Sequence, residues 1–189
     1  MSYSYDLIKA DGQRKYLNGS ELRQFKNATQ YFSPTTRIFC LLIANTGCLI
    51  SEALNLTYVD FDFAKKSVLI NSLRRRSKEK IRSIPLPDTL LDELQLAHEC
   101  GIEQAEKKLW SWSRKTANTK IKKVMDKAGI EGFFATSIGL RHGFGVHCVI
   151  NGVPIVYIKK WLGHSSLEVT CMYLTVINQN ERSLAEKMW

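Results

Sequence analysis

Hydrophobic alternation with a period of two occurs in only one part of the chain, and this limits the possible folds more than any other feature. Three short runs carry it, at 59–62, 67–70 and 81–84, and such runs are typical of β-strands. A turn at 64–66 separates the first two runs, and a longer, very basic connection separates the second from the third. We therefore predict a small three-stranded antiparallel sheet in the middle of the sequence.

Both flanks of this sheet carry the periodicity of amphipathic helices. Upstream, we expect a helix capped by Ser20, a buried helix that opens at Pro34 and ends at Thr46-Gly47, and a turn of helix over 51–54. Downstream, the predicted helices begin at Asp88 and then cover 116–128, 140–150, 154–162, 167–174 and 181–188. The expected fold class is mainly α with a small three-stranded antiparallel sheet (α+β).

The length of the chain predicts a single domain. Its 189 residues are 44% hydrophobic, which suffices for one core and is too little to expect two. Residues 1–16 show no period and are expected to form a loose N-terminal arm. The domain is expected to run from 17 to 178, and residues 179–189 to form a C-terminal helical tail.

Charge and cysteine content indicate the class of partner and the compartment. The 27 Lys and Arg against 18 Asp and Glu give a formal charge of +9, which favours a polyanionic partner, most commonly nucleic acid. The five cysteines are widely spaced without a CxxC pair, so we predict buried reduced thiols, no metal and no cofactor. Residues 1–13 do not form a signal peptide, and no apolar run approaches the length of a membrane span. We therefore expect a cytoplasmic protein.

The last third of the chain contains the side chains needed to break a phosphodiester bond. They occur in the segments GLRHGFGVH at 139–147 and LGHSSL at 162–167, followed by Tyr173. A phenol is a weak nucleophile until the phosphate is neutralised and a proton path exists. An arginine fork can bind the non-bridging oxygens, and a histidine can donate to them or shuttle the proton.

These segments resemble the signature of the tyrosine recombinase (phage-type DNA integrase) family. In that family Leu-Arg-His precedes Leu-Gly-His-Ser-Ser, and a tyrosine follows the second histidine by nine residues, the spacing of His164 and Tyr173. Upstream, NTGCLISEAL at 45–54 resembles the first arginine box, and RSIPLP at 82–87 resembles the end of the β-hairpin. The resemblance covers roughly 17–174 and implies the fold of the recombinase catalytic domain.

The resemblance also implies roles for individual residues. Tyr173 would attack a DNA phosphate, giving a 3′-phosphotyrosine and a free 5′-hydroxyl, while Arg141 clamps the phosphate. His164 would hydrogen-bond the transition state, His142 would support the site, and Glu52 would help to hold the first-arginine loop. The implied partners are double-stranded DNA and further copies of the chain, as a tetramer on two DNA sites. The implied location is the nucleoid.

Three positions depart from the family pattern. Leu49 stands where the first box has its arginine, and Ile138 stands where the family has His or Lys. The catalytic lysine of the hairpin aligns best with Arg76, although Lys78 is close. Losing a transition-state donor of this kind costs about 10²- to 10⁵-fold in rate, and arginine does not release a proton at ordinary pH. Strand cleavage should therefore be slow or absent, either through decay or repurposing of the enzyme or through deliberate alteration.

The basic hairpin is a second candidate DNA-binding element. It places six positive charges in nine residues between two predicted strands: Arg74, Arg75, Arg76, Lys78, Lys80 and Arg82. Although such a loop can simply be solvated, the family resemblance favours contact with the DNA backbone and release of counterions. A weaker second basic face consists of Lys120, Lys122, Lys123 and Lys127.

Several alternatives remain open. The chain is expected to be a strand-exchange enzyme with impaired chemistry, a DNA-binding regulator that kept the fold, or another phosphoryl-transfer protein with a coincidental match. The DNA-clamping domain that usually precedes the catalytic domain is missing from the sequence, as in a fragment or a small single-domain recombinase. Residues 181–189 carry an apolar set at helical spacing, which predicts docking on a neighbouring subunit or on the same domain.

Overall fold

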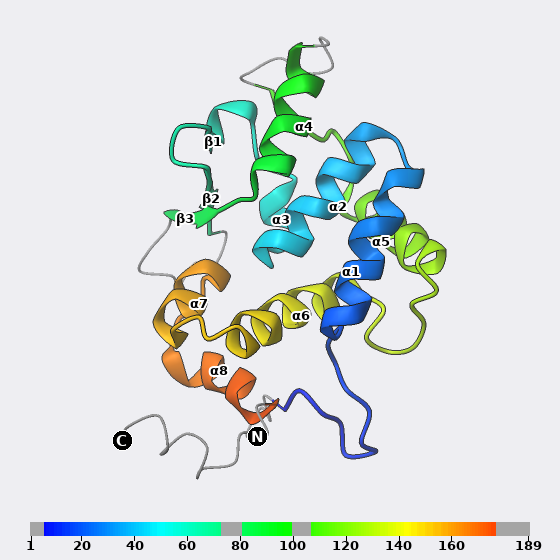
Figure 1. Ribbon diagram of the computed structural model, residues 1–189, viewed down its shortest axis with the longest axis vertical. Helices are drawn as coiled ribbons and strands as arrows, with labels where there is room; N and C mark the ends of the chain where they lie inside the picture. Colours follow the sequence, from blue (N-terminus) through cyan, green and yellow to red (C-terminus); the bar gives the residue numbers. More distant parts are fainter. Residues whose placement is uncertain (1–5, 73–80, 100–106, 177–189) are drawn as a thin grey trace.

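Helix α6 (Ser137–Ile150) runs through the middle of the molecule, and the other elements are arranged around it (Figure 1). The computed structural model describes residues 6–72, 81–99 and 107–176. Helices α1 (Gly19–Ala28) and α2 (Pro34–Thr46) contact α6 on one side, and α7 (Ile155–Leu162) contacts it on the other. The mainly helical fold with one small sheet confirms the predicted fold class.

The sheet has the predicted three antiparallel strands in the order β1-β2-β3. They are β1 (Phe61–Asp62), β2 (Ser67–Asn71) and β3 (Ile81–Pro85), and Val68 pairs with Ile84. The inward residues of β2 and β3 are fully buried, whereas Leu69 on the opposite face is 43% exposed. β1 is shorter than predicted because Tyr58–Asp60 forms a 3₁₀ turn, in which the Asp60 carboxylate accepts the Thr57 backbone N–H.

Helix starts differ from the sequence predictions where a cap lies earlier in the chain. Asn18, not Ser20, caps α1, since its side chain accepts the Glu21 N–H while the Glu21 carboxylate accepts the Asn18 N–H. Ser113 caps α5 (Arg114–Lys127), and Thr136 caps α6, which therefore includes position 138. The remaining helices are α3 (Ile50–Ala53), α4 (Asp88–Glu99) and α8 (Leu167–Cys171), and α8 passes into a 3₁₀ helix, η3 (Met172–Val176).

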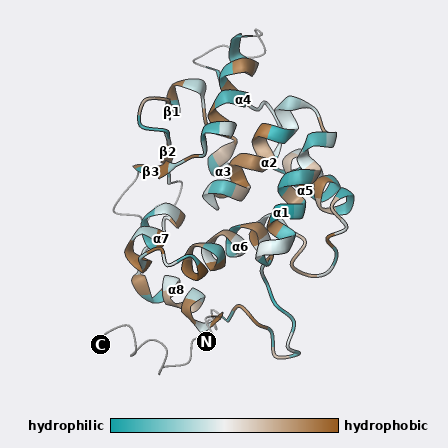
Figure 2. Ribbon diagram, viewed as in Figure 1, coloured by the Kyte–Doolittle hydropathy of each residue, from teal (hydrophilic) through white to brown (hydrophobic). Residues whose placement is uncertain are grey.

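The buried side chains form two clusters. The larger joins α1, α2, α4, α5 and the sheet, with Phe25 and Phe39 fully buried at its centre. Hydrophobic residues recur along α2 and α6 (Figure 2), in agreement with the buried helix predicted at 34–46. The smaller cluster lies between α6, α7 and η3 and includes Phe144, Leu162 and Tyr173.

The N-terminal segment packs on the domain, which differs from the expected loose arm. Leu7 belongs to the smaller cluster and is 2% exposed. The Lys15 N–H donates to the Leu7 carbonyl, and the ammonium of Lys9 lies 3.4 Å from the ring centroid of Phe133. The segment has no hydrophobic period because a short irregular hairpin needs only one apolar anchor.

Some predictions fall outside the described residues. These are the basic hairpin tip at 73–80 and the tail helix at 181–188. Of the cysteines in the described part, Cys40, Cys48 and Cys148 are buried, Cys171 is half-buried, and all four are unpaired thiols. None of the helices in the described ranges is long and apolar enough to span a bilayer.

Candidate active site

Tyr173 is held inside the domain by a histidine of α6. Its side chain is completely buried in η3, and its hydroxyl lies 3.1 Å from Nδ1 of His142. Burial raises the pKa of Tyr173 to about 12. Burial also lowers the pKa of His142 to about 4, with further contributions from the charges of Arg141 and Lys15. At neutral pH the pair is therefore a neutral phenol beside a neutral imidazole.

Close packing on both sides fixes the tyrosine ring. A Cβ added to Gly145 would lie 2.5 Å from the Tyr173 ring, so α6 can approach this ring only through a glycine. On another side the imidazole of His164 is nearly parallel to the phenol ring, at 10° and 6.1 Å between centroids. His164 is itself buried, and its Nδ1 lies 3.0 Å from the hydroxyl of Thr170. The structure thus brings together the predicted Tyr173, His142 and His164.

Arg141 joins two of the sequence segments that the family resemblance brought together. Its Nη1 donates to the carbonyl of Gly47 at 2.8 Å, and its Nη2 donates to the carbonyl of Leu162 at 2.6 Å. Gly47 ends α2 with a positive φ of 62°, and a Cβ there would lie 2.7 Å from Leu162 and from Phe144. Arg141 as a whole is 5% exposed, and its guanidinium is oriented by these two backbone carbonyls.

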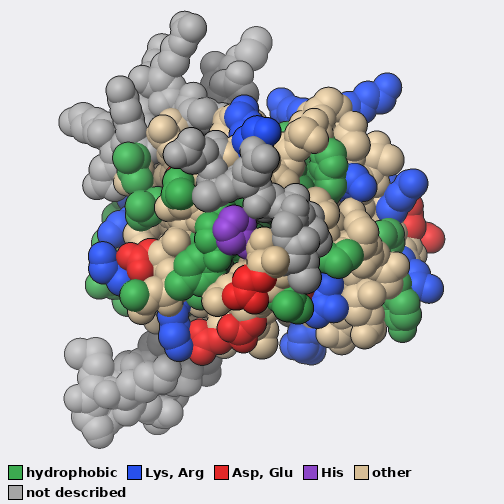
Figure 3. Space-filling view, turned by 90° about the horizontal axis from the view of Figure 1, so that it is seen from above, with side chains coloured by type: hydrophobic (Ala, Val, Ile, Leu, Met, Phe, Trp, Pro, Cys, Tyr) green, Lys and Arg blue, Asp and Glu red, His purple; other side chains and the backbone are tan. Residues whose placement is uncertain are grey.

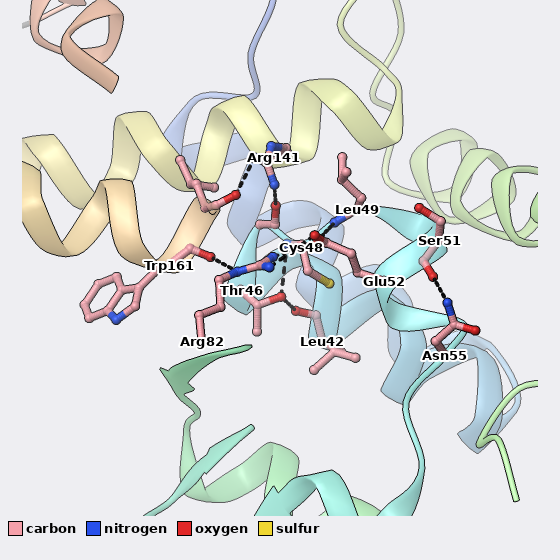
Figure 4. A network of polar contacts seen from close by, with 12 residues as sticks. Leu42, Thr46, Cys48, Leu49, Ser51, Glu52, Asn55, Arg82, Arg141 and Trp161 are labelled. Carbon is pink, nitrogen blue, oxygen red and sulfur yellow. Dashed lines mark hydrogen bonds and ion pairs between the residues drawn. The ribbon is translucent and has the colours of Figure 1, made fainter. Parts of the chain in front are cut away.

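Arg82 is also buried, which differs from the exposed position expected of a residue that contacts DNA with the hairpin. It forms an ion pair with Glu52 at 2.7 Å, and its Nε donates to the carbonyl of Trp161 at 2.8 Å (Figure 4). The side chain is 2% exposed, and its charge is balanced within the domain by the Glu52 carboxylate. Strand alternation could have shown this, because Arg82 shares a sheet face with the buried Ile84.

Two buried arginines therefore hold consecutive carbonyls at the end of one helix. Trp161 and Leu162 are the last residues of α7, where helix carbonyls lack partners within the helix and the dipole favours positive charge. Gly163 follows with a positive φ of 67°, and a Cβ there would lie 3.1 Å from the Arg82 guanidinium. Since His164 comes next, the two arginines fix the segment from which this histidine projects.

Leu49 and Ile138 are apolar residues at positions where the family resemblance predicts hydrogen-bond donors. Leu49 caps α3, and its backbone N–H donates to the Glu52 carboxylate at 2.9 Å. Its side chain points toward α6 in Figure 4, and it offers no donor. Ile138 is 48% exposed in the first turn of α6. The third departure, Arg76, lies outside the described residues, as do Arg74, Arg75, Lys78 and Lys80.

The second basic face is largely engaged in local contacts. Lys120 lies over the Trp112 ring and donates to the Thr36 hydroxyl, and Lys127 lies over the Tyr31 ring. Lys122 forms an exposed ion pair with Asp126. In the view of Figure 3, basic side chains are spread around the face and acidic side chains lie among them. Within 6–72, 81–99 and 107–176, no three metal-binding side chains are grouped so that they could hold an ion.

Comparison with known proteins identifies the family and the fold of this chain. A family model described as the phage integrase family matches residues 15–180. Tyrosine recombinase XerA of Thermococcus onnurineus (strain NA1) is 30% identical over 181 residues, which cover 92% of this chain and 62% of that protein. The chain thus spans less than two thirds of that relative's length.

Two solved structures show the same fold. The XerH site-specific recombinase bound to difH substrate superimposes with a TM-score of 0.76 at 18% identity, over 96% of this chain and 59% of that one. The catalytic domain of bacteriophage HP1 integrase does so with a TM-score of 0.67 at 21% identity, over 92% of this chain and 95% of that one. The chain belongs to the phage integrase family, the tyrosine recombinases, and has the fold of their catalytic domain.

Proposed function

We propose that this chain is the catalytic domain of a DNA strand-exchange enzyme that acts through a phosphotyrosine intermediate at Tyr173. The observation that carries the proposal is the 3.1 Å contact between the Tyr173 hydroxyl and His142, beside the buried Arg141 and His164. A nucleophile, a cationic fork and a hydrogen-bonding imidazole are the groups that transesterification of a phosphodiester requires. Relatives with this fold include a recombinase bound to its DNA substrate.

The proposed reaction exchanges one ester for another. The phenolic oxygen of Tyr173 forms a bond to phosphorus as it loses its proton, and the bond to the 5′-oxygen of the DNA breaks. The phenol proton passes to solvent, and the leaving oxygen takes a proton from solvent to become a free hydroxyl. Arg141 and His164 donate hydrogen bonds to the non-bridging oxygens. His142 positions the phenol, and its pKa of about 4 makes it a weak proton acceptor at neutral pH.

We further propose that cleavage by this chain is slow. Leu49 supplies no second cation for the phosphate, and Ile138 supplies no donor near it. The nucleophile is also fully buried with a pKa raised to about 12, so η3 must move before Tyr173 can meet DNA. Each lost donor costs about 10²- to 10³-fold in rate, although such losses in one site do not simply multiply.

The alternative function is a DNA-binding regulator that kept the fold and lost catalysis. Leu49 favours it, because an apolar side chain removes half of the phosphate clamp without disturbing the Glu52 contact to its backbone. Nicked suicide DNA substrates distinguish the two functions. A covalent protein–DNA band that is absent from Tyr173→Phe supports the enzyme, whereas tight DNA binding without such a band supports the regulator.

We also propose assembly on DNA as a tetramer, with the tail at 179–189 docked on a neighbouring subunit. Within the tail, Leu184, Met188 and Trp189 form an apolar set at roughly helical spacing. Deleting 183–189 should abolish higher-order DNA complexes in sedimentation experiments while the thermal unfolding temperature stays unchanged. If the truncated chain unfolds instead, the tail packs on its own domain.

A further inference from the structure

A second group of basic side chains lies in a small pocket between α1, α2 and α6. The pocket has a volume of about 220 Å³. Its polar side chains are Arg23 and Lys26 from α1, Asn45 from α2 and His147 from α6. His142 and His147 are five residues apart on α6, which places them about 140° apart around the helix axis. The pocket is therefore separate from the site of Tyr173.

The positive charge in this pocket is not balanced by an acidic side chain among the described lining residues. None of the described residues that line it is Asp or Glu, and neither Arg23 nor Lys26 forms an ion pair within the described chain. The nearby Glu21 is bonded to the Asn18 N–H and to an arginine of the N-terminal segment. The pKa of His147 is lowered by burial and by the charges of Lys26 and Arg23. A bound anion would relieve this repulsion.

The donors converge on one end of α1. A Cβ added to Gly19 would lie 3.7 Å from Arg23 Nη1 and 4.0 Å from His147 Nδ1, so both groups face the first turn of the helix. The Glu21 N–H of that turn is already bonded to the Asn18 side chain, and the positive end of the helix dipole favours an anion there. Lys26 Nζ is fixed nearby by a 2.6 Å hydrogen bond to Asn45 Oδ1. Drug-sized ligands occupy pockets of about 300–1,000 Å³, so this smaller pocket suits one tetrahedral oxyanion.

We propose that the α1–α2–α6 pocket binds a phosphate group, with Arg23 as the bidentate partner and Lys26 and His147 as further donors. The phosphate comes either from the DNA backbone or from a free phosphate, because both present the same oxyanion. The proposal goes beyond strand exchange, since none of these residues belongs to the tyrosine site. Binding a phosphate anion favours the imidazolium form of His147, so phosphate should raise the pKa of that ring.

Titration of the whole chain with inorganic phosphate, followed through the His147 ring resonances by NMR, tests the proposal. We expect a saturable shift and a raised His147 pKa, neither of which chloride at the same ionic strength reproduces. The charged groups acting on the ring are Lys26 and Arg23 from α1, and the Asn151 amide nitrogen lies 3.3 Å from its Nδ1. Arg23→Gln should weaken phosphate binding about tenfold. Lys65→Gln, which removes one charge from a side chain 83% exposed in the β1–β2 turn, should leave it unchanged.

A second experiment, in which duplex DNA is added to the phosphate-bound chain, identifies the source of the phosphate. If the DNA backbone occupies the pocket, duplex DNA displaces inorganic phosphate from His147, and Arg23→Gln lowers the salt slope of DNA binding by about one ion. If the ligand is free phosphate, His147 keeps its phosphate response in the DNA complex. A chain that takes phosphate without binding DNA would support this pocket while contradicting the proposed strand exchange. The proposal is overturned if the His147 resonances show no saturable response to either ligand. It is also overturned if Lys65→Gln weakens phosphate binding as much as Arg23→Gln does.

Discussion

Arg82 of β3 and Glu52 of α3 form a buried bidentate ion pair. The pair connects the sheet to the segment 45–54, which resembles the first arginine box of the family. The two contacts measure 2.7 and 3.1 Å, and both side chains are at most 3% exposed. The same carboxylate accepts the N–H of Leu49, and the same guanidinium donates to the carbonyl of Trp161. Three segments far apart in the sequence thus meet at one charge pair.

Breaking this pair from one side should strongly destabilise the domain. Arg82→Met or Glu52→Leu leaves an uncompensated buried charge, and we expect each to lower the free energy of unfolding by about 3–5 kcal/mol. Combining both changes should cost less than their sum, because neither charge is then left alone. Urea unfolding measures these values. Lys122→Ala, which breaks an exposed pair with Asp126, is the control and should cost less than about 1 kcal/mol. If Arg82→Met and Glu52→Leu each lower the free energy of unfolding no more than Lys122→Ala does, the buried pair does not stabilise the domain as proposed.

Stability should fall as the solution is acidified because of His142. Its folded pKa is about 4, below the usual 6.5, so the unfolded chain binds more protons between these two values. The contribution of the neutral ring is therefore complete above about pH 6.5 and lost as the pH falls toward 4. His142→Phe should flatten this part of the profile of unfolding free energy against pH. His98→Phe, at a histidine of α4 that stacks on the Tyr58 ring, serves as the control. An unchanged slope in His142→Phe would contradict the assigned pKa.

The basic hairpin should contribute most of the salt dependence of DNA binding. Replacing Arg74, Arg75 and Arg76 with Ala should reduce the slope of log affinity against log salt by up to about three ions, as counterion release predicts. The matched control replaces Lys120, Lys122 and Lys127, whose charges already have local partners, and should change the slope less. Mobility-shift titrations at several salt concentrations give both slopes. Equal slopes for the two triple variants would argue against a special role for the hairpin.

Elements with a strong period or a familiar motif could be predicted from the sequence. The buried α2 and the three strands follow from apolar runs, and the grouping of Tyr173 with His142 and His164 follows from the family resemblance. Two features could not be predicted in the same way. The packing of Leu7 depends on a single anchor without a period. The burial of Arg82 is hidden in the sequence because its charge resembles that of the neighbouring hairpin residues, although its position in the strand predicts an inward side chain.

The pocket around Arg23 and His147 shows a further limit of sequence reasoning. Its residues come from three helices, and those from α6 lie about a hundred positions or more after those from α1 and α2 in the sequence. No spacing rule connects them, because their proximity depends on how α1 and α2 cross α6. The two carbonyls held by Arg141 and Arg82 are likewise invisible in the sequence, since any residue type supplies a backbone carbonyl.

The central claim is that Leu49 and Ile138 limit the chemistry of an otherwise assembled site, and covalent adduct formation by revertants tests it most directly. The backbone at position 49 is already held by Glu52, so Leu49→Arg places a cation on a fixed loop opposite Arg141. With Ile138→Lys added, we expect the 3′-phosphotyrosyl adduct on a nicked cognate site to form at least about 10²-fold faster than in the starting protein. Arg76→Lys should increase the rate further by supplying a transferable proton. Tyr173→Phe in the revertant must abolish the adduct. A revertant that binds DNA yet forms no adduct, or a starting protein that already cleaves as fast as the revertant, would contradict the claim.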